Sequence, residues 1–208
     1  MAYSNTLTER QQRIHLYLKC AANLYGHITP RAFLVLFNRF NTPKLLKEEL
    51  IRHRSKLMRQ PDCNYSIYVN AIVNDDSDDD LIDDIIDYQG KKAIYIPSEE
   101  EFLKYENALH YEENEQTQDL REYLCIKRKL NIFSVNILMG ELSRSIRTEE
   151  PFSCQVERLD ACHAFTDDPE ETQTLLDLLM HMVNNTRMWA NYGHTPREML
   201  EIMSRNKD

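Results

Sequence analysis

Residues 44–71 read KLLKEELIRHRSKLMRQPDCNYSIYVNA, and their hydrophobic periodicity changes along the way. As far as Met58 the apolar positions recur every three or four residues, which indicates an amphipathic helix. After Pro61 apolar and polar residues alternate from Tyr65 to Ala71, as in a half-buried strand. The pattern therefore predicts a basic helix followed by a strand in the N-terminal part of the chain.

Two further helices are expected before this stretch. Thr6 with Glu9 forms a capping-box pattern, and the apolar residues that follow predict a helix from about Leu7 to Tyr25. Two Thr-Pro pairs, at 29–30 and 42–43, supply an N-cap and a first-turn proline to the second and third helices. We therefore expect three consecutive helices before the strand.

A second strand candidate lies at residues 93–96, and we expect it to pair with residues 65–73. Three helices followed by two strands is the order of a winged-helix module. An aspartate-rich segment lengthens the connection between the two strands. Residues 1–97 are therefore predicted to form a winged-helix-like module with an acidic insertion.

Residues 98–208 are predicted to be helical throughout. Ser98 and Glu101 form a second capping box, and Asp168 and Thr195 precede prolines as N-caps of later helices. The expected fold class is mainly α with a small β-hairpin, in which a winged-helix-like N-terminal module precedes a C-terminal helical bundle. The later predicted helices cover residues 115–130, 133–147, 153–165, 169–191 and 196–205.

Composition limits the cellular location and the redox chemistry. The chain has 208 residues, of which only 4 are Gly and 7 are Pro, so loop-rich and all-β architectures are disfavoured. It has no apolar run of about 20 residues, and residues 1–10 are too polar for a secretory signal. Five widely spaced cysteines without a CxxC pair argue against a disulfide scaffold and a zinc finger. A cytoplasmic protein is expected.

The aspartate-rich segment, residues 75–87, holds eight aspartates and no cation. A calcium loop counted from Asp76 would need Gly where Leu81 stands and Glu where Asp87 stands, so that interpretation is disfavoured. A solvated loop or a short amphipathic helix is the simpler interpretation. The functional alternative is a mimic of nucleic-acid phosphate that binds a partner. The candidate partner-binding residues are Asp78, Asp79, Asp80, Asp83 and Asp84.

Residues 44–59 have the opposite charge, with six Lys or Arg against two Glu. Because the net charge of the chain is −9, nucleic-acid binding requires a separate basic face of this kind. The third helix is thus a candidate recognition helix, and its alternative is a solvated face that pairs with the acidic segment. The candidate nucleic-acid-binding residues are Lys47, Arg52, Arg54, Lys56 and Arg59.

Catalytic motifs are not found in the sequence. The seven histidines are scattered without an HExxH arrangement, and four glycines leave no room for a phosphate-binding loop. Adjacent Cys162 and His163 would point about 100° apart on a helix, which disfavours a thiolate–imidazole pair. We therefore expect no enzyme and no cofactor or metal.

The most distinctive string is NNTRMWANYGHTPREM at residues 184–199. Its simplest interpretation is structural, because Trp189 is the only tryptophan, and Gly193 with Thr195 can end one helix and cap the next. The string resembles an NNTxMWxNxGHTPxE signature shared by poorly characterised Gram-positive bacterial proteins, whose N-terminal pattern is similar to residues 22–38 here. Many of those proteins carry a Cys-rich SEC-C zinc motif after the signature, which this chain lacks, so zinc binding is not carried over.

The chain also looks like some plasmid- or phage-encoded anti-CRISPR proteins in size, charge and general character. That resemblance implies a non-enzymatic inhibitor of a type II effector nuclease that acts on the effector or its guide RNA. The alternative expectation is a winged-helix DNA-binding transcription regulator. In both cases the partner is a macromolecule, either a bacterial protein or ribonucleoprotein or a DNA, and no membrane is involved.

Overall fold

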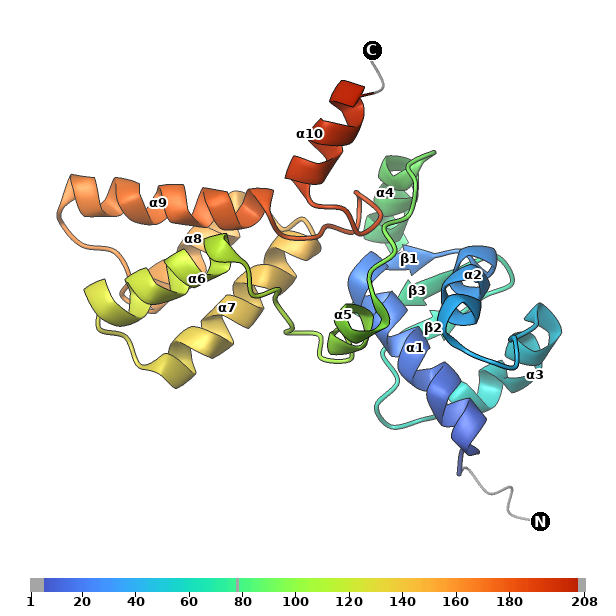
Figure 1. Ribbon diagram of the computed structural model, residues 1–208. Helices are drawn as coiled ribbons and strands as arrows, with labels where there is room; N and C mark the ends of the chain where they lie inside the picture. Colours follow the sequence, from blue (N-terminus) through green and yellow to red (C-terminus); the bar gives the residue numbers. More distant parts are fainter. Residues whose placement is uncertain (1–5, 78, 206–208) are drawn as a thin grey trace. The chain divides into compact units, whose positions relative to one another are not determined.

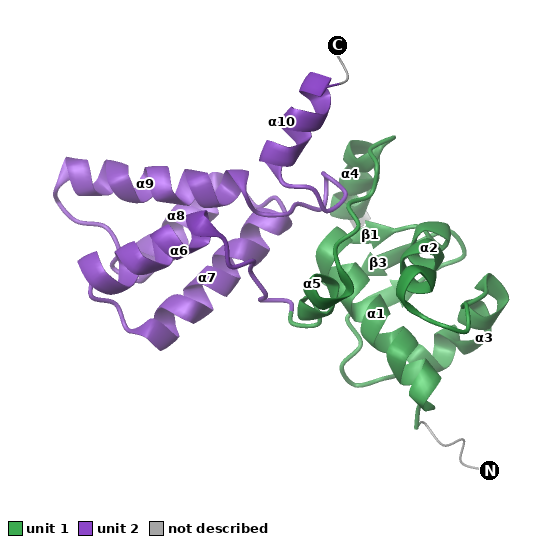
Figure 2. Ribbon diagram, in the orientation of Figure 1, with its two compact units in different colours: residues 1–107 green, residues 108–208 purple. Residues whose placement is uncertain are grey.

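The computed structural model describes residues 6–77 and 79–205, which form a mainly helical fold with one small antiparallel sheet (Figure 1). The chain divides into two compact units, unit 1 at residues 1–107 and unit 2 at residues 108–208 (Figure 2). The elements of unit 1 are α1 (Glu9–Tyr25), β1 (His27–Ile28), α2 (Pro30–Phe40), α3 (Lys47–Leu57), β2 (Tyr65–Ile67), β3 (Ile72–Asn74), α4 (Asp79–Gln89) and α5 (Glu99–Lys104). The elements of unit 2 are α6 (Glu115–Glu122), the π-helix η1 (Tyr123–Lys127), α7 (Ile132–Arg147), α8 (Phe152–Ala161), α9 (Pro169–Asn184) and α10 (Pro196–Arg205).

Helix α1 begins with a capping box that lies two residues after the predicted one. The Gln11 amide donates to Thr8 Oγ1 at 3.3 Å and the Thr8 amide donates to Gln11 Oε1 at 3.1 Å, so the prediction of Thr6 and Glu9 as the capping pair is wrong. The helix ends at Gly26, whose φ of 64° lies in the region that glycine adopts at little cost. The Gly26 carbonyl then accepts a hydrogen bond from the Asn74 amide.

The sheet of unit 1 has the strand order β1-β3-β2. Tyr68 N–H donates to the Ala71 carbonyl at 2.7 Å, so residues 68–71 form a tight turn and β2 pairs with β3 directly after it. The predicted pairing of residues 65–73 with residues 93–96 is therefore wrong. Local pairing costs less loop-closure entropy, and β1 and β2 already occupy both edges of the central strand β3. Residues 93–96 form no strand, and the Tyr95 carbonyl accepts a hydrogen bond from Tyr25 Oη.

Helix α3 begins at Lys47 rather than after Thr42 and Pro43, so the prediction that this pair caps it is wrong. The side chain of Asn38 accounts for the late start. Its Nδ2 donates to the Leu45 carbonyl at 3.0 Å, and its Oδ1 accepts from the Leu45 amide at 2.6 Å. Because both backbone groups of Leu45 are used in this way, the residue stays outside the helix.

The core of unit 1 forms around α1. The ring of Tyr17 packs against Phe37 on α2 at 5.0 Å and against Phe102 on α5 at 5.3 Å. Helix α5 has the predicted Ser98–Glu101 capping box. Because α5 packs on α1, the first unit extends to residue 107 rather than to the predicted boundary at residue 97.

Unit 2 is a set of helices around one apolar cluster, in which α6 packs on α9 and α7 packs on α8. Three predicted helices end earlier than expected. Helix α6 continues as the π-helix η1 only to residue 127, α8 ends at residue 161 and α9 ends at residue 184. The buried cluster consists of Leu120, Leu124, Val135, Leu138, Met139, Leu142, Ile146, Leu159, Ala164, Leu175, Leu179 and Met182.

A glycine inside α7 allows a close approach within unit 2. A Cβ built on Gly140 would lie 2.6 Å from the Leu109 carbonyl oxygen and 3.0 Å from the Leu109 Cβ. Real Cβ atoms do not make such contacts, so the backbone at residue 109 lies against α7 only because position 140 has no side chain.

Candidate nucleic-acid interface

One groove of unit 1 lies between α2, the start of α3 and the turn of the β2–β3 hairpin. We call it the hairpin groove, and its volume is about 910 Å³. Helix α2 turns its outer face to the groove, because its positions 31, 35 and 38 follow helical spacing and the opposite side buries Phe33 and Phe37. The lining residues are Thr29, Pro30, Arg31, Leu34, Val35, Asn38, Arg39, Lys44, Lys47, Val69 and Asn70.

A second groove runs along the other part of α3 beside the same hairpin. Val69 at the hairpin turn lines both grooves, so the two form one continuous face, which we call the basic face. Exposed apolar side chains accompany the cations, since Val69 is 60% exposed and Tyr68 is 58% exposed. The lining residues of the second groove are Arg54, Ser55, Met58, Arg59, Ile67, Tyr68 and Val69.

The charge of the basic face is of one sign. Among the described residues, no carboxylate lines either groove, and the six lining cations form no ion pair with another described side chain. The sequence agrees with this segregation, because residues 1–74 carry eleven Lys and Arg against four Asp and Glu. The lining cations are Arg31, Arg39, Lys44, Lys47, Arg54 and Arg59.

The five cations predicted on and around the third helix have four different environments. Lys47 lines the hairpin groove, and Arg54 and Arg59 line the second groove. Arg52 is exposed and lines neither of them. Lys56 is half-buried and its Nζ donates to Gln11 Oε1 on α1 at 3.2 Å, so it supports the packing of α3.

An ion pair from α1 fixes the start of α3 beside the hairpin groove. Arg10 Nε lies 2.6 Å from Glu49 Oε1 and Arg10 Nη2 lies 2.9 Å from Glu49 Oε2, a bidentate arrangement. The same guanidinium donates to the Pro43 and Lys44 carbonyls at 2.9 and 3.1 Å. The hydrogen bond with Arg10 lowers the pKa of Glu49. The backbone from which Lys44 and Lys47 project is therefore held in place.

A buried histidine holds β2 against α1. His15 Nδ1 lies 2.5 Å from Tyr65 Oη, and His15 Nε2 lies 3.0 Å from Asp62 Oδ1. Lys19 Nζ donates to Asp62 Oδ2 at 2.7 Å, and this hydrogen bond, together with the one from His15, lowers the pKa of Asp62 to about 2. Because His15 and Tyr65 are buried, their contact positions the hairpin, while the Asp62 side chain is 59% exposed.

The aspartates of the acidic segment form one stripe on α4. The predicted residue Asp78 and the side chain of Asp79 lie outside the described part of the structure. Asp80, Asp83 and Asp84 are exposed, and Asp87, which was not among the predicted site residues, is exposed beside them. Helical spacing puts all four on the side opposite the buried Ile85 and Gln89. These aspartates and the predicted cations of α3 thus lie in different parts of unit 1.

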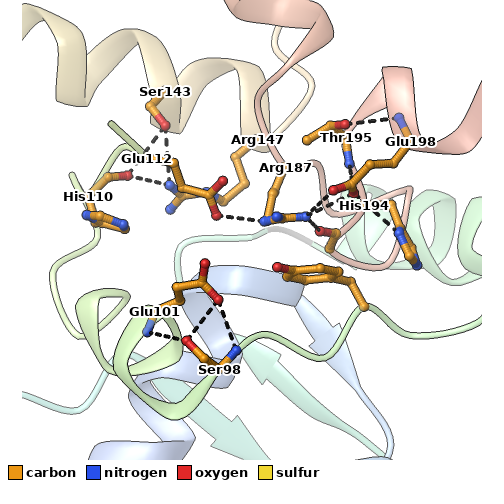
Figure 3. Close-up of polar contacts among 12 residues, drawn as sticks. Ser98, Glu101, His110, Glu112, Ser143, Arg147, Arg187, His194, Thr195 and Glu198 are labelled. Atoms are coloured by element: carbon orange, nitrogen blue, oxygen red, sulfur yellow. Dashed lines mark hydrogen bonds and ion pairs between the residues drawn. The ribbon is translucent and has the colours of Figure 1, made fainter. Parts of the chain in front are cut away.

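The string at residues 184–199 surrounds a buried cation in unit 2 (Figure 3). Arg187 Nε lies 2.6 Å from Glu112 Oε1, and Arg187 Nη1 lies 3.0 Å from Glu198 Oε2 and 3.1 Å from the Gly193 carbonyl. Thr195 and Glu198 cap α10 reciprocally, at 3.1 and 3.0 Å. Trp189 is only 3% exposed. The predicted burial of Trp189 and the predicted cap at Thr195 are confirmed, but the prediction that Gly193 ends a helix is wrong, because α9 ends at Asn184.

Neighbouring groups favour the charged form of the Glu198 carboxyl, although the side chain is partly buried. Burial opposes the charge, but hydrogen bonds from His194 and the Thr195 amide, together with the Arg187 guanidinium, lower the pKa of Glu198 to about 2. A second arginine of unit 2, Arg147, is 2% exposed and donates to the His110 carbonyl at 2.6 Å. These cations hold the unit together.

Three cations that line the hairpin groove were missed by the sequence interpretation, namely Arg31, Arg39 and Lys44. A signal for the first was present, because residues 31, 35 and 38 share one face of the second helix opposite its phenylalanines. Lys44 gave no such signal, because its position depends on the contacts of Arg10 with the 43–44 backbone.

Comparison with protein-family models, with curated proteins and with solved structures gives no significant match. Within the described residues, no three His, Cys, Asp or Glu side chains are grouped so that they could hold a metal ion. A search of the same residues finds no helix with the length and apolar character that crossing a bilayer requires.

Proposed function

We propose that unit 1 is a winged-helix module that binds a nucleic-acid duplex through α3 and the β2–β3 hairpin. Its elements follow the order α1, β1, α2, α3, β2, β3, and the sheet order β1-β3-β2 leaves the hairpin turn beside α3. In helix-turn-helix modules the recognition helix enters the major groove. Here the turn residues Tyr68 and Val69 line the same groove as α3.

The observation that carries this proposal is the group of six exposed cations without a carboxylate on the basic face. Cations that are close together and unpaired repel one another, so an anionic partner lowers their energy. Lys47 and Arg54 are seven residues apart, which puts them on one line of α3 about 10 Å apart along its axis. One strand of a duplex carries a phosphate about every 3.4 Å along its axis, so cations about 10 Å apart span roughly three phosphates.

Titration of a fluorescently labelled random duplex DNA, at salt concentrations from about 50 to 200 mM, tests the proposal by fluorescence anisotropy. Because each neutralised phosphate contributes about −0.9 to the slope of log K against log salt, several contacts should give a slope of roughly −4 to −5. Replacing Lys47 or Arg54 by Ala should weaken binding and reduce that slope by about 1. Binding that does not depend on salt, or that both variants retain in full, would contradict the proposal.

A matched control uses Lys91→Ala, because Lys91 is an exposed cation of unit 1 that lines neither groove. This variant removes the same charge from the same unit and should bind like the unaltered protein. An equal loss for Lys91→Ala and Lys47→Ala would show that only the overall charge matters, which would also contradict a defined interface.

A second candidate function is inhibition of an RNA-guided effector nuclease, as the likeness to anti-CRISPR proteins implies. The observation that favours it is the stripe of four exposed aspartates on α4, because carboxylates in one row on a helix imitate a row of phosphates. Replacing Asp80, Asp83 and Asp84 by Asn should then abolish inhibition in a nuclease protection assay. If guide RNA is contacted instead, Lys47→Ala and Arg54→Ala should abolish it while the aspartate variant stays active.

The order of addition adds information to this assay. The protein is added before and after a type II effector assembles with its guide RNA, because a competitor for the guide acts only before assembly. Inhibition that both sets of variants retain would exclude both charge mechanisms. No inhibition by the unaltered protein would exclude this function for that effector.

A further inference from the structure

The acidic stripe of α4, defined as Asp80, Asp83, Asp84 and Asp87, faces away from the unit that carries it. Positions i, i+3, i+4 and i+7 share one side of a helix, and they extend along about 10 Å of its axis. The stripe therefore presents four carboxylates in a compact row to whatever approaches from solvent.

Contacts on the other side of α4 prevent the stripe from turning inward. Gln89 Nε2 donates to the Tyr25 and His27 carbonyls at 3.0 and 3.2 Å, and Gln89 Oε1 lies 2.9 Å from His27 Nδ1. Ile85 is 2% exposed on the same side. None of the described residues of α4 lines the hairpin groove or the second groove. Docking of the stripe into the groove of its own chain would break these buried contacts.

The hairpin groove complements the stripe in charge and in polarity. Its four cations, Arg31, Arg39, Lys44 and Lys47, match four carboxylates in number, and no described carboxylate of the groove competes for them. Apolar side chains accompany the charges on both surfaces. Val35 and Val69 are exposed at the groove, while Ile86 and Tyr88 are exposed on α4.

We propose that the acidic stripe of α4 binds the hairpin groove of a second copy of this chain. The contact is heterologous, because one copy contributes its stripe and the other its groove. The second copy occupies the face assigned to nucleic acid and therefore competes with nucleic acid for it. In this one respect the contact deepens the proposed function and rests on it. The self-association itself depends on the two surfaces of this chain alone.

Sedimentation velocity of the full chain without nucleic acid tests this contact. At low salt the average sedimentation coefficient should rise with protein concentration, and about 0.5 M salt should reverse the rise because it screens the ion pairs. A stripe variant, Asp80→Lys with Asp83→Lys and Asp84→Lys, and a groove variant, Arg31→Glu with Lys44→Glu and Lys47→Glu, should each sediment as a monomer.

Mixing the two variants gives the decisive measurement. In the mixture the intact stripe of the groove variant faces the intact groove of the stripe variant, and the Lys stripe of one faces the Glu groove of the other, so an equimolar mixture should associate again. Circular dichroism and thermal melting confirm that each variant is folded. The control is Glu157→Lys with Asp160→Lys and Asp167→Lys, which reverses three exposed carboxylates in unit 2 and should associate like the unaltered chain.

The outcomes separate this inference from the proposed function. A mixture that stays monomeric, or an unaltered chain that never associates, overturns the self-association even if duplex DNA binds. Association that the mixture restores, together with no binding of duplex DNA, supports the contact and contradicts the proposed function.

Discussion

Arginine has opposite environments in the two units. Arg187 in unit 2 is 8% exposed and contacts two carboxylates and a carbonyl oxygen, so its donors are used within the protein. Arg54 in unit 1 is exposed beside the hairpin and forms no ion pair with a described side chain. The guanidinium stabilises the fold in the first case and is available to an external anion in the second.

Pairing, rather than residue type, distinguishes a structural cation from an exposed cation that is proposed to bind a partner. A buried charge without partners is costly, so Arg187 requires Glu112 and Glu198. An exposed charge costs little without a partner, so Arg54 and Lys47 need none within the fold. Changes at the first kind of site should affect stability, and changes at the second kind should affect binding.

The largest effect on stability is expected for Trp189→Ala. The ring is 3% exposed, and truncation of a buried tryptophan costs about 3–5 kcal/mol. Thermal melting followed by circular dichroism measures the loss, and every activity should fall with it. A variant with an unchanged melting temperature that no longer binds its partner would instead identify Trp189 as an interface residue.

Arg187→Ala should destabilise unit 2 by about 2–3 kcal/mol, because it leaves Glu112 and Glu198 without their shared cation. The two carboxylates keep part of their hydration, which puts the value below that of a fully buried pair. Urea unfolding followed by the fluorescence of Trp189, the only tryptophan, reports on unit 2. Duplex binding by the folded variant should be unchanged, and a loss of binding without a loss of stability would refute the comparison.

The stability of unit 2 should fall in acid because of Glu198. Its pKa is about 2 in the folded state and ordinarily 4.5, so its contribution is present above about pH 4.5 and is lost as the pH falls toward 2. Since the side chain is 36% exposed, solvent screening reduces the contribution to about 1 kcal/mol. Urea midpoints at pH 5 and pH 2.5 should differ less for Glu198→Gln than for the unaltered protein, while Asp62 titrates in both.

The smallest effect on stability is expected on the basic face. Lys47→Ala and Arg54→Ala should change the free energy of unfolding by no more than about 0.5 kcal/mol, because neither side chain forms an ion pair with a described residue. Circular dichroism during urea titration is the measurement. A loss of stability above about 1 kcal/mol would show that these two cations stabilise the fold.

Helix positions could largely be predicted from the sequence because caps are local signals. Ser98 with Glu101, Asp168 and Thr195 each cap the helix for which they were proposed. The start of α3 could not be predicted, because Asn38 reaches across seven residues to both backbone groups of Leu45. The strand pairing failed for a similar reason, since alternation alone does not reveal that residues 68–71 form a turn.

The candidate site was predicted in part. Charge segregation pointed to α3, and Lys47, Arg54 and Arg59 line the grooves of the basic face. The sequence did not separate them from Lys56, because the contact of that residue with Gln11 depends on how α3 packs on α1. The roles of the acidic segment and of the family signature remain predictions.

Gly140 has a consequence for engineering this protein. Exchanging a helical glycine for alanine is a common way to raise stability, since glycine costs a helix about 1 kcal/mol relative to alanine. At this position the new methyl group would meet the Leu109 carbonyl at 2.6 Å, so the helical gain would be lost to a steric clash with fixed backbone. A stabilisation programme guided by helix propensity alone would select this exchange and produce a less stable chain.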